Sequence, residues 1–210
     1  MGREINFYRT RSGKCPMEAF FDSLQPVEAQ KVAWVLRVIQ ELDKVPSQYF
    51  KKLIGSEEIW ECRIQIQSKA YRIFSFFLEG DTLVLTHGYS KKSQKTDAKQ
   101  IKRAENYRRD YLGQRKEPIV SDLEKYISKR KKKDPHFAKG FEEGYKEFKI
   151  GVLLKQAREE AGLTQEQLAG MINTQKTAIS RIENHAEDIK LSTIQKVANA
   201  LGKNLEIILR

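Results

Sequence analysis

A run of basic, aromatic and hydroxyl-bearing side chains follows the last strand predicted in the N-terminal half. It occupies residues 87–96, which read His, Gly, Tyr, Ser, Lys, Lys, Ser, Gln, Lys and Thr, while Arg63 and Arg72 lie on the two preceding predicted strands. Cations stabilise the negative charge that develops on phosphorus when a 2′-hydroxyl attacks it, and tyrosine, histidine or lysine can move protons. These residues therefore suit chemistry on an RNA backbone. The alternative is a solvated charged loop, the commonest fate of a charge run.

A second stretch, residues 163–183, has the pattern of two short helices joined by a tight turn. Gly162 ends the preceding helix, Thr164 and Gln167 form a capping box that opens the next one, and Asn173 tolerates the left-handed conformation that the turn needs. Helices joined so tightly cannot lie parallel, so the second one projects from the bundle. That geometry places a helix in the major groove of DNA.

The outer face of this second predicted helix carries side chains that read base edges or phosphates. Arginine and lysine reach guanine O6 and N7, threonine contacts a base edge or a thymine methyl, and a helix N-terminus suits a phosphate. The residues predicted to bind DNA are Thr164, Gln165, Gln175, Lys176, Thr177, Ser180 and Arg181.

The elements that must position the first cluster are predicted by a change of hydrophobic period. Alternation over residues 60–67 indicates a half-buried strand, and two further strands follow at 71–78 and 82–89, which together predict an antiparallel meander. If Trp60 and Cys62 face the helices, Arg63 faces the other side of the sheet, which is often open. The remaining predictions are a strand at 5–8 and helices at 16–24, 27–45, 99–112, 122–133, 153–161 and 192–201.

Composition limits the class of protein. The chain has 210 residues, with 39 Lys and Arg against 28 Asp and Glu and a formal charge of +11, which favours a polyanionic partner. The two cysteines, Cys15 and Cys62, do not form a metal-binding pair, so we expect reduced thiols, no zinc and no other cofactor in a cytoplasmic protein. We also expect no signal peptide and no membrane span.

The change from strand to helix spacing predicts two domains of different class, α+β followed by all-α. We expect the first at residues 1–113, a linker at 114–120 that contains Pro118, a helical segment at 121–149 and a DNA-binding domain at 150–210. Four aromatic residues of the helical segment are predicted to form a stripe on one helix. Whether the stripe packs within its own domain or docks on the first is left open by the spacing. The four aromatic residues of this stripe are Phe137, Phe141, Tyr145 and Phe148.

The N-terminal half resembles the RelE/HigB family of toxins, in its phage-derived branch. The resemblance rests on the order of elements and on three blocks, at residues 60–63, 71–74 and 86–95. It implies a metal-independent, ribosome-dependent endoribonuclease that cuts mRNA. It implies that Arg63 and Arg72 bind or stabilise phosphate and that Lys91, Lys92 and Lys95 belong to the same site. The predicted catalytic residues are Arg63, Arg72, Tyr89, Lys91 and Lys95, and Lys92 and Lys99 are predicted to bind RNA. Tyr89 stands where the family more often has Phe, and His87 is expected to be a packed strand residue rather than the general base.

The C-terminal half resembles Cro/repressor-type helix-turn-helix proteins over about 50 residues, through the runs at 163–169 and 179–183. From about Ser121 it resembles the HigA antitoxin as a whole. By the family pattern, Glu183 is structural rather than a base reader. The resemblance implies operator DNA as a partner and a homodimer on a palindromic site.

The two resemblances together predict a toxin–antitoxin fusion. The helical segment would cover the toxin, within one chain or across a dimer, and the chain would act mostly as a transcription repressor. The alternative is a transcription regulator whose basic N-terminal domain is a non-catalytic interaction module. If Arg63, Arg72 and Lys91–Lys95 share one surface, the first reading is favoured.

Overall fold

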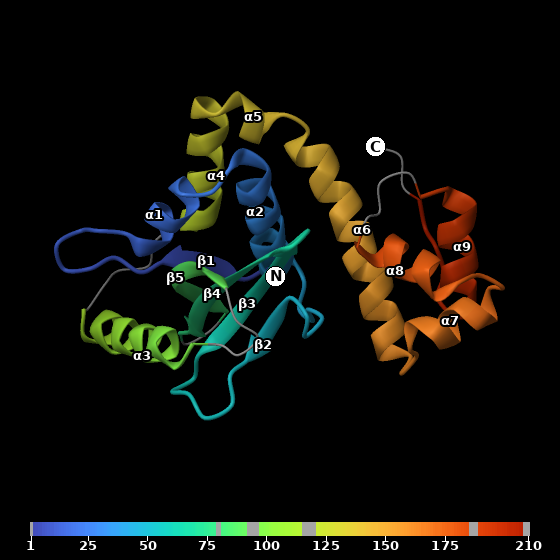
Figure 1. Cartoon of the computed structure of the whole chain (residues 1–210), viewed down its shortest axis with the longest axis horizontal. Coiled ribbons are helices and arrows are strands. Elements are labelled where there is room, and N and C mark those ends of the chain that lie inside the picture. The colour runs from blue at the N-terminus through green and yellow to red at the C-terminus, as the bar shows by residue number, and fades with distance from the viewer. Residues whose placement is uncertain (1, 79–80, 92–96, 115–120, 185–188, 208–210) are drawn as a thin grey trace. The chain divides into compact units, whose positions relative to one another are not determined.

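The structure, a computed structural model, describes residues 2–78, 81–91, 97–114, 121–184 and 189–207. It divides into two compact units, Met1–Lys139 and Gly140–Arg210. The first contains a sheet with helices and the second only helices (Figure 1). The predicted fold class, α+β followed by all-α, is confirmed. In the described part of the chain, no helix is long and apolar enough to cross a membrane.

A five-stranded sheet in the order β1-β5-β4-β3-β2 forms the centre of the first unit. The predicted meander is confirmed as β3 (Trp60–Ile66), β4 (Lys69–Phe77) and β5 (Thr82–Lys91). β1 (Glu4–Phe7) pairs parallel to β5, and β2 (Phe50–Lys52) pairs antiparallel to β3. Sequence reasoning missed β2, because three residues are too few for an alternating pattern to be recognised.

Helices cover both faces of this sheet. α1 (Pro16–Asp22) and α2 (Pro26–Glu41) lie on one side and α3 (Ala98–Gly113) on the other (Figure 1). α1 approaches β5 at Gly88, where an added Cβ would lie 2.3 Å from the Phe20 ring. On the α3 side, Ala104 packs against Phe74. The second face, which was expected to be open, is therefore covered in part by α3.

α4 (Asp122–Lys133) and α5 (Pro135–Ala138) complete the first unit. β1 is an edge strand, and the start of α4 satisfies its outward backbone groups: Asp122 accepts a hydrogen bond from the Phe7 amide at 2.9 Å, and the Ser121 hydroxyl donates to the Ile5 carbonyl at 3.2 Å. Tyr126 stacks on Phe21 with ring centroids 4.5 Å apart. An unpaired edge is thus capped by polar side chains of a later segment.

Two further contacts hold this segment. Arg130 donates to the carbonyl of Leu24 at 3.0 Å, just beyond the end of α1. The side-chain amide of Gln30 on α2 donates to the carbonyl of Phe137 at 2.6 Å. Leu123 and Phe137 are fully buried. The segment therefore contributes to the core of the first unit.

The structural division falls after Lys139, whereas sequence reasoning ended the first domain at residue 113. Most of the expected linker, residues 115–120, lies outside the described residues. The predicted single aromatic helix is wrong: Phe137 belongs to α5, and the chain turns at Gly140, whose φ is +64°, before Phe141 begins the next helix.

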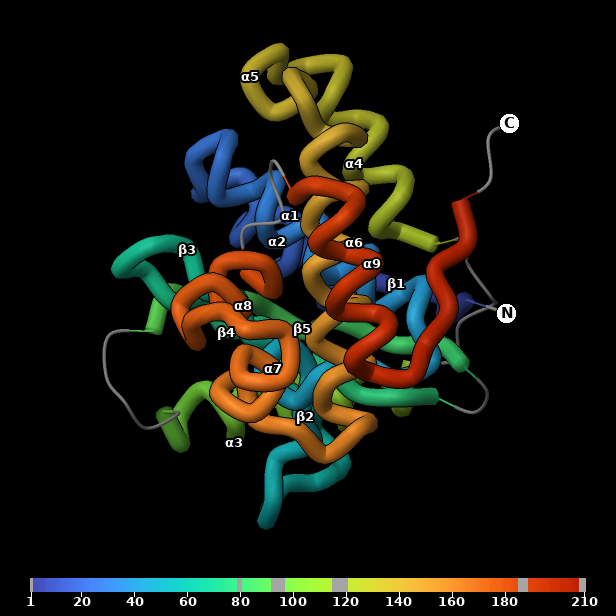
Figure 2. Tube along the Cα trace, turned by 90° about the vertical axis from the view of Figure 1, so that its right-hand side faces the viewer, coloured from blue at the N-terminus to red at the C-terminus, as the bar shows by residue number. Residues whose placement is uncertain are grey.

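The second unit consists of α6 (Phe141–Glu160), α7 (Gln165–Met171), α8 (Lys176–Asn184) and α9 (Leu191–Ala200). α8 packs against α6, and α7 packs against α8 and α9 (Figures 1 and 2). Gly151 of α6 allows this packing, because a Cβ there would meet the Glu183 carbonyl of α8 at 2.8 Å. Leu168, Ile179 and Val197 form the core.

The local signals of the helix-turn-helix are confirmed. Thr164 and Gln167 form a reciprocal capping box, Gly162 follows the end of α6 with φ +68°, and Asn173 turns the chain with φ +53°. The helix before the motif is longer than predicted, because it begins at Phe141 rather than Leu153.

Candidate nucleic-acid sites

A row of three candidate residues crosses the middle of the sheet. Arg63 of β3 lies directly opposite Arg72 of β4, and Arg72 lies directly opposite Tyr89 of β5. Because directly paired residues share a face, all three point to the side of the sheet that carries α3. Lys91, two residues beyond Tyr89, is on the same face. The register thus brings together four of the five residues predicted as catalytic.

A buried carboxylate that sequence reasoning missed joins the two arginines. Glu61 is 0% exposed, and its oxygens lie 2.8 Å from Nε of Arg63 and 3.3 Å from Nε of Arg72. The side chains of Arg63 and Arg72 are 33% and 11% exposed. Strand alternation already places residues 61 and 63 on one face, so the signal was present in the sequence. The sequence did not show that Arg72 of the next strand lies beside Glu61.

Burial and neighbouring charges shift the pKa values of Arg72, Tyr89 and Lys91. Burial and the nearby charge of Arg63 lower the pKa of Arg72, which still stays charged at neutral pH. Burial, and then the charges of Arg72 and Arg63, lower the pKa of Lys91. Burial and the Glu61 carboxylate raise the pKa of Tyr89. Lys91 therefore loses its proton more readily than an ordinary lysine, and its neutral amine can act as a base.

The other residues of this block have separate positions. His87 is 2% exposed, contacts the Thr86 hydroxyl and the Gln100 side chain at 3.2 and 3.0 Å, and has its pKa lowered by burial to about 4. It is a packed, neutral strand residue, as expected. Lys99 is exposed in the first turn of α3. Lys92 and Lys95 fall within residues 92–96, outside the described residues.

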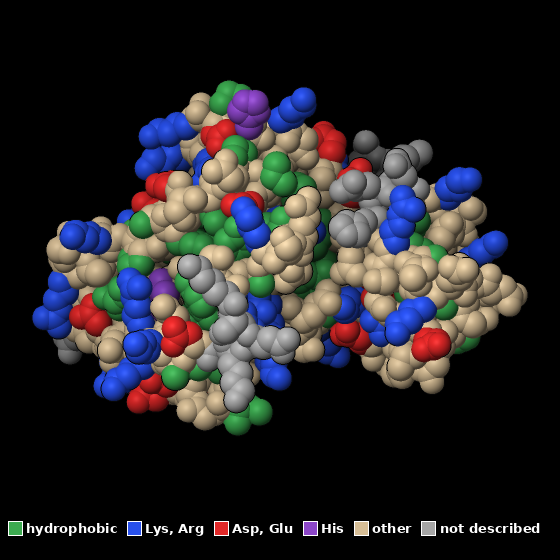
Figure 3. Space-filling view, in the orientation of Figure 1, with side chains coloured by type: hydrophobic (Ala, Val, Ile, Leu, Met, Phe, Trp, Pro, Cys, Tyr) green, Lys and Arg blue, Asp and Glu red, His purple; other side chains and the backbone are tan. Residues whose placement is uncertain are grey.

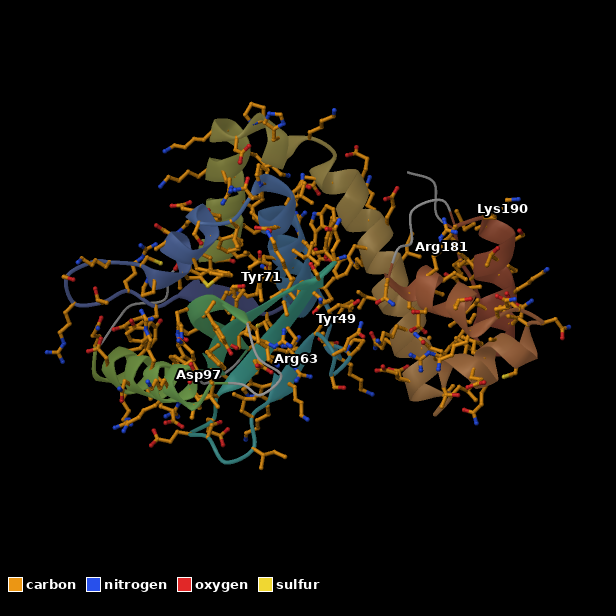
Figure 4. The ribbon with its side chains drawn as sticks, viewed as in Figure 1. Tyr49, Arg63, Tyr71, Asp97, Arg181 and Lys190 are labelled. Atoms are coloured by element: carbon orange, nitrogen blue, oxygen red, sulfur yellow. The ribbon has the colours of Figure 1, made fainter. Side chains whose placement is uncertain are left out.

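A cleft of about 610 Å³ adjoins Tyr89. Its lining comes from α1, the start of α2, β4, β5 and α3, and includes Phe20, Tyr71, Ser90 and Arg103. Figure 4 labels Tyr71 and Arg63 within the first unit, and Figure 3 shows Lys and Arg side chains over α3 and α4. Within the described residues, no group of three or more His, Cys, Asp or Glu side chains is placed to hold a metal.

The candidate DNA-binding residues lie around α7 and α8. Thr164, Gln175, Lys176, Thr177 and Arg181 are exposed, and Figure 4 labels Arg181 on α8. Ser180 is half-buried and its carbonyl accepts a hydrogen bond from Asn184 at 2.7 Å. The side-chain amide of Gln165 donates to Glu183 at 2.8 Å, so this group is already used within the unit.

Glu183 has a structural position. It is 2% exposed, and its two oxygens accept from Nε and Nη2 of Arg158 at 2.5 and 3.0 Å. Such a bidentate pair fixes α8 against α6. It thereby holds the exposed face of α8, with Lys176 and Arg181, outward.

Comparisons with known proteins match both parts of the chain. Residues 19–109 match the family model of phage-derived Gp49-like proteins, and residues 154–208 match a helix-turn-helix family model. The chain is 29% identical over 92 residues to Antitoxin HigA1 from two strains of Mycobacterium tuberculosis. That stretch is 44% of this chain, and the chain spans 62% of the length of these relatives. The chain thus combines a segment similar to phage-derived Gp49-like proteins with a segment similar to helix-turn-helix proteins.

Proposed function

We propose that this chain is a toxin–antitoxin protein. Its N-terminal unit would be a RelE/HigB-like, ribosome-dependent mRNA endonuclease, and its C-terminal helices a HigA-like antitoxin that binds operator DNA and represses transcription. The observation that carries the proposal is the row of Arg63, Arg72 and Tyr89, with Lys91, on one sheet face of the Gp49-like segment. The helix-turn-helix match and the similarity to an antitoxin support the second half.

The proposed chemistry uses these side chains in distinct roles. The 2′-hydroxyl of the RNA attacks the neighbouring phosphorus, the 5′-oxygen leaves, and a 2′,3′-cyclic phosphate and a 5′-hydroxyl result. Arg63 and Arg72 stabilise the extra negative charge on the phosphoryl oxygens, in place of a metal ion. The neutral amine of Lys91 takes the proton from the 2′-hydroxyl, and the phenol of Tyr89 gives a proton to the leaving 5′-oxygen. The cleft beside Tyr89 would take a nucleoside next to the reacting phosphate.

The position of α4 and α5 changes how the fused antitoxin is expected to act. The contacts described above tie them to β1, α1 and α2, whereas the cation row points to the opposite face. We therefore propose that residues 121–139 are part of the folded toxin unit and not a lid over Arg63 and Arg72, so that neutralisation comes from residues beyond 139.

For the second unit, the proposed role is sequence-specific binding of operator DNA as a homodimer. The exposed face of α8 would enter the major groove, with Lys176, Thr177 and Arg181 toward the bases and Thr164 toward a phosphate. Gln165 is the weakest member of the proposed set, because its amide group already bonds Glu183.

Translation in a cell-free system tests the nuclease half. The full chain, residues 1–139 and the 1–139 fragment with Arg63→Ala and Arg72→Ala are compared. The fragment ends at residue 139 because a cut within 114–120 would remove Tyr126 and Phe137 from the core. Inhibition with mRNA cleavage by the fragment, lost in the double variant, supports the proposal. A well-folded fragment that leaves translation and mRNA intact would refute it and favour a non-catalytic interaction module.

A further inference from the structure

Glu61 lies beneath Arg63 and Arg72 and has no exposed surface. From its place between two guanidinium groups we propose that Glu61 is a positioning residue of the RNA site: it aims Arg63 and Arg72 and reduces the net charge of the row so that phosphate is held in one orientation. This inference rests on the proposed endonuclease function. It concerns a residue that would not itself touch the RNA.

The contacts of Glu61 are made with the Nε edge of each arginine. Its two oxygens are used separately, Oε2 for Arg63 at 2.8 Å and Oε1 for Arg72 at 3.3 Å. A guanidinium that is held at Nε still has its Nη groups for other acceptors. Arg72 uses Nη1 on the carbonyl of Tyr71 at 2.8 Å. The carboxylate therefore fixes the plane of Arg63 by a hydrogen bond and holds Arg72 beside it as an ion pair, while donors remain for a phosphate.

The sheet itself requires such a residue. Arg63 and Arg72 are directly opposite each other on β3 and β4, and like charges in this position destabilise a strand pair. Arg72 is also largely buried, which is costly for an uncompensated charge. One carboxylate between two guanidiniums leaves a net charge of about +1, enough to attract a phosphodiester without mutual repulsion between the arginines.

Glu61 also affects the two candidate proton-transfer groups. Its charge raises the pKa of Lys91, against the lowering effect of burial, Arg72 and Arg63. Burial, the charge of Glu61 and the charge of Asp97 raise the pKa of Tyr89. A hydrogen bond with the backbone of Asp97 and the charge of Arg72 act in the opposite direction. Loss of this carboxylate would therefore lower both pKa values and shift the pH profile of cleavage toward lower pH.

The test compares full-length wild type with Glu61→Gln and with a matched control, Glu57→Gln. The control removes the same charge from an exposed carboxylate that pairs with Arg109. A short single-stranded RNA is the probe for binding, and cleavage of mRNA is measured in the cell-free translation assay, in whichever form of the chain is active there. A residue needed only for folding would lose binding and cleavage together.

The positioning role predicts opposite changes in these two measurements for Glu61→Gln. We expect kcat to fall roughly 10²-fold, the scale for a misplaced catalytic group. RNA binding should be as tight or tighter, with a salt slope steeper by about 0.7, the value for one added cation on a single strand. Unchanged kcat would overturn the proposal, as would equal losses of kcat and binding in a folded variant.

Arginine side-chain NMR tests the hold directly, without any substitution or activity. In the wild-type chain, the Nε proton of Arg63, which is donated to Glu61, should exchange with solvent more slowly than that of the exposed Arg181. Equal exchange rates would overturn the proposal even if Glu61→Gln fails to fold. A wild-type chain with slow exchange but no cleavage in any form would refute the proposed function instead, and with it a role for Glu61 in catalysis.

Discussion

Replacement of Tyr126 by alanine tests whether α4 is part of the first unit or a detachable cover. Tyr126 is 7% exposed, stacks on Phe21 and donates to the Asp22 carboxylate at 2.7 Å. Removal of a buried aromatic ring costs about 3–5 kcal/mol, and a lost hydrogen bond to a charged group adds about 1.5–3 kcal/mol. The two effects are not additive in one side chain, so we expect a loss of about 4 kcal/mol.

Tryptophan fluorescence measures this loss selectively. Both tryptophans, Trp34 and Trp60, lie in the first unit, and the second unit has none. With a urea m-value of about 2 kcal/mol/M, a loss of about 4 kcal/mol would shift the fluorescence midpoint down by about 2 M. The matched control is Lys132→Ala, an exposed residue of the same helix, which should shift it by less than about 0.3 M.

The result separates the two descriptions of the segment. If α4 were only a detachable cover joined by a linker, weakening its contact with Phe21 would leave the sheet as stable as before. The urea midpoint of tryptophan fluorescence would then barely change for Tyr126→Ala. A shift below about 0.5 M for Tyr126→Ala, with normal helix content, would refute the cooperative packing argued here. Tyr126→Phe should fall between the two, because it keeps the ring and removes only the hydroxyl.

Three further predictions follow from single contacts. Because the pKa of His87 is lowered from 6.5 to about 4, its unfolded form binds more protons between these values, so stability should be lost as pH falls from about 6.5 to 4. Urea unfolding followed by tryptophan fluorescence at pH 7 and pH 4.5 measures this, and a His87→Gln variant with the same pH slope would rule out the assignment. Gly88→Ala should destabilise the first unit by about 1–3 kcal/mol through its clash with Phe20, and Phe20→Leu should restore part of the loss in the same assay if the clash is the cause. Arg181→Ala should weaken binding by about 1–3 kcal/mol at one base position in a set of operator variants, whereas an equal loss on every sequence would indicate a phosphate contact only.

Local signals made the second unit predictable from the sequence. The capping box of Thr164 and Gln167, the glycine at 162 and the turn at Asn173 act over three or four residues, and each has the predicted geometry. The interior of the motif followed from helical spacing for the same reason, as Leu168 and Ile179 show. Such interactions depend on neighbours in the chain, which the sequence displays directly.

Strand alternation predicted part of the candidate site in the first unit. It placed Arg63 on the face opposite Cys62, and the pairing of β3, β4 and β5 then set Arg72 and Tyr89 beside it. The sequence thus determined which residue types were available and which face each would share with its own strand neighbours. It did not determine the register between strands.

Contacts between distant parts of the chain were decided only by the tertiary structure. They include the parallel pairing of β1 with β5, the cover of α3 over part of the second face, and the bond of Asp122 to the Phe7 amide. Sequence periodicity reports which side of an element is apolar but not which distant segment covers it. For that reason α4 was predicted to start a separate antitoxin, although its side chains complete the core and edge of the first unit. The contact of Glu61 with Arg72 likewise depends on the pairing of β3 with β4.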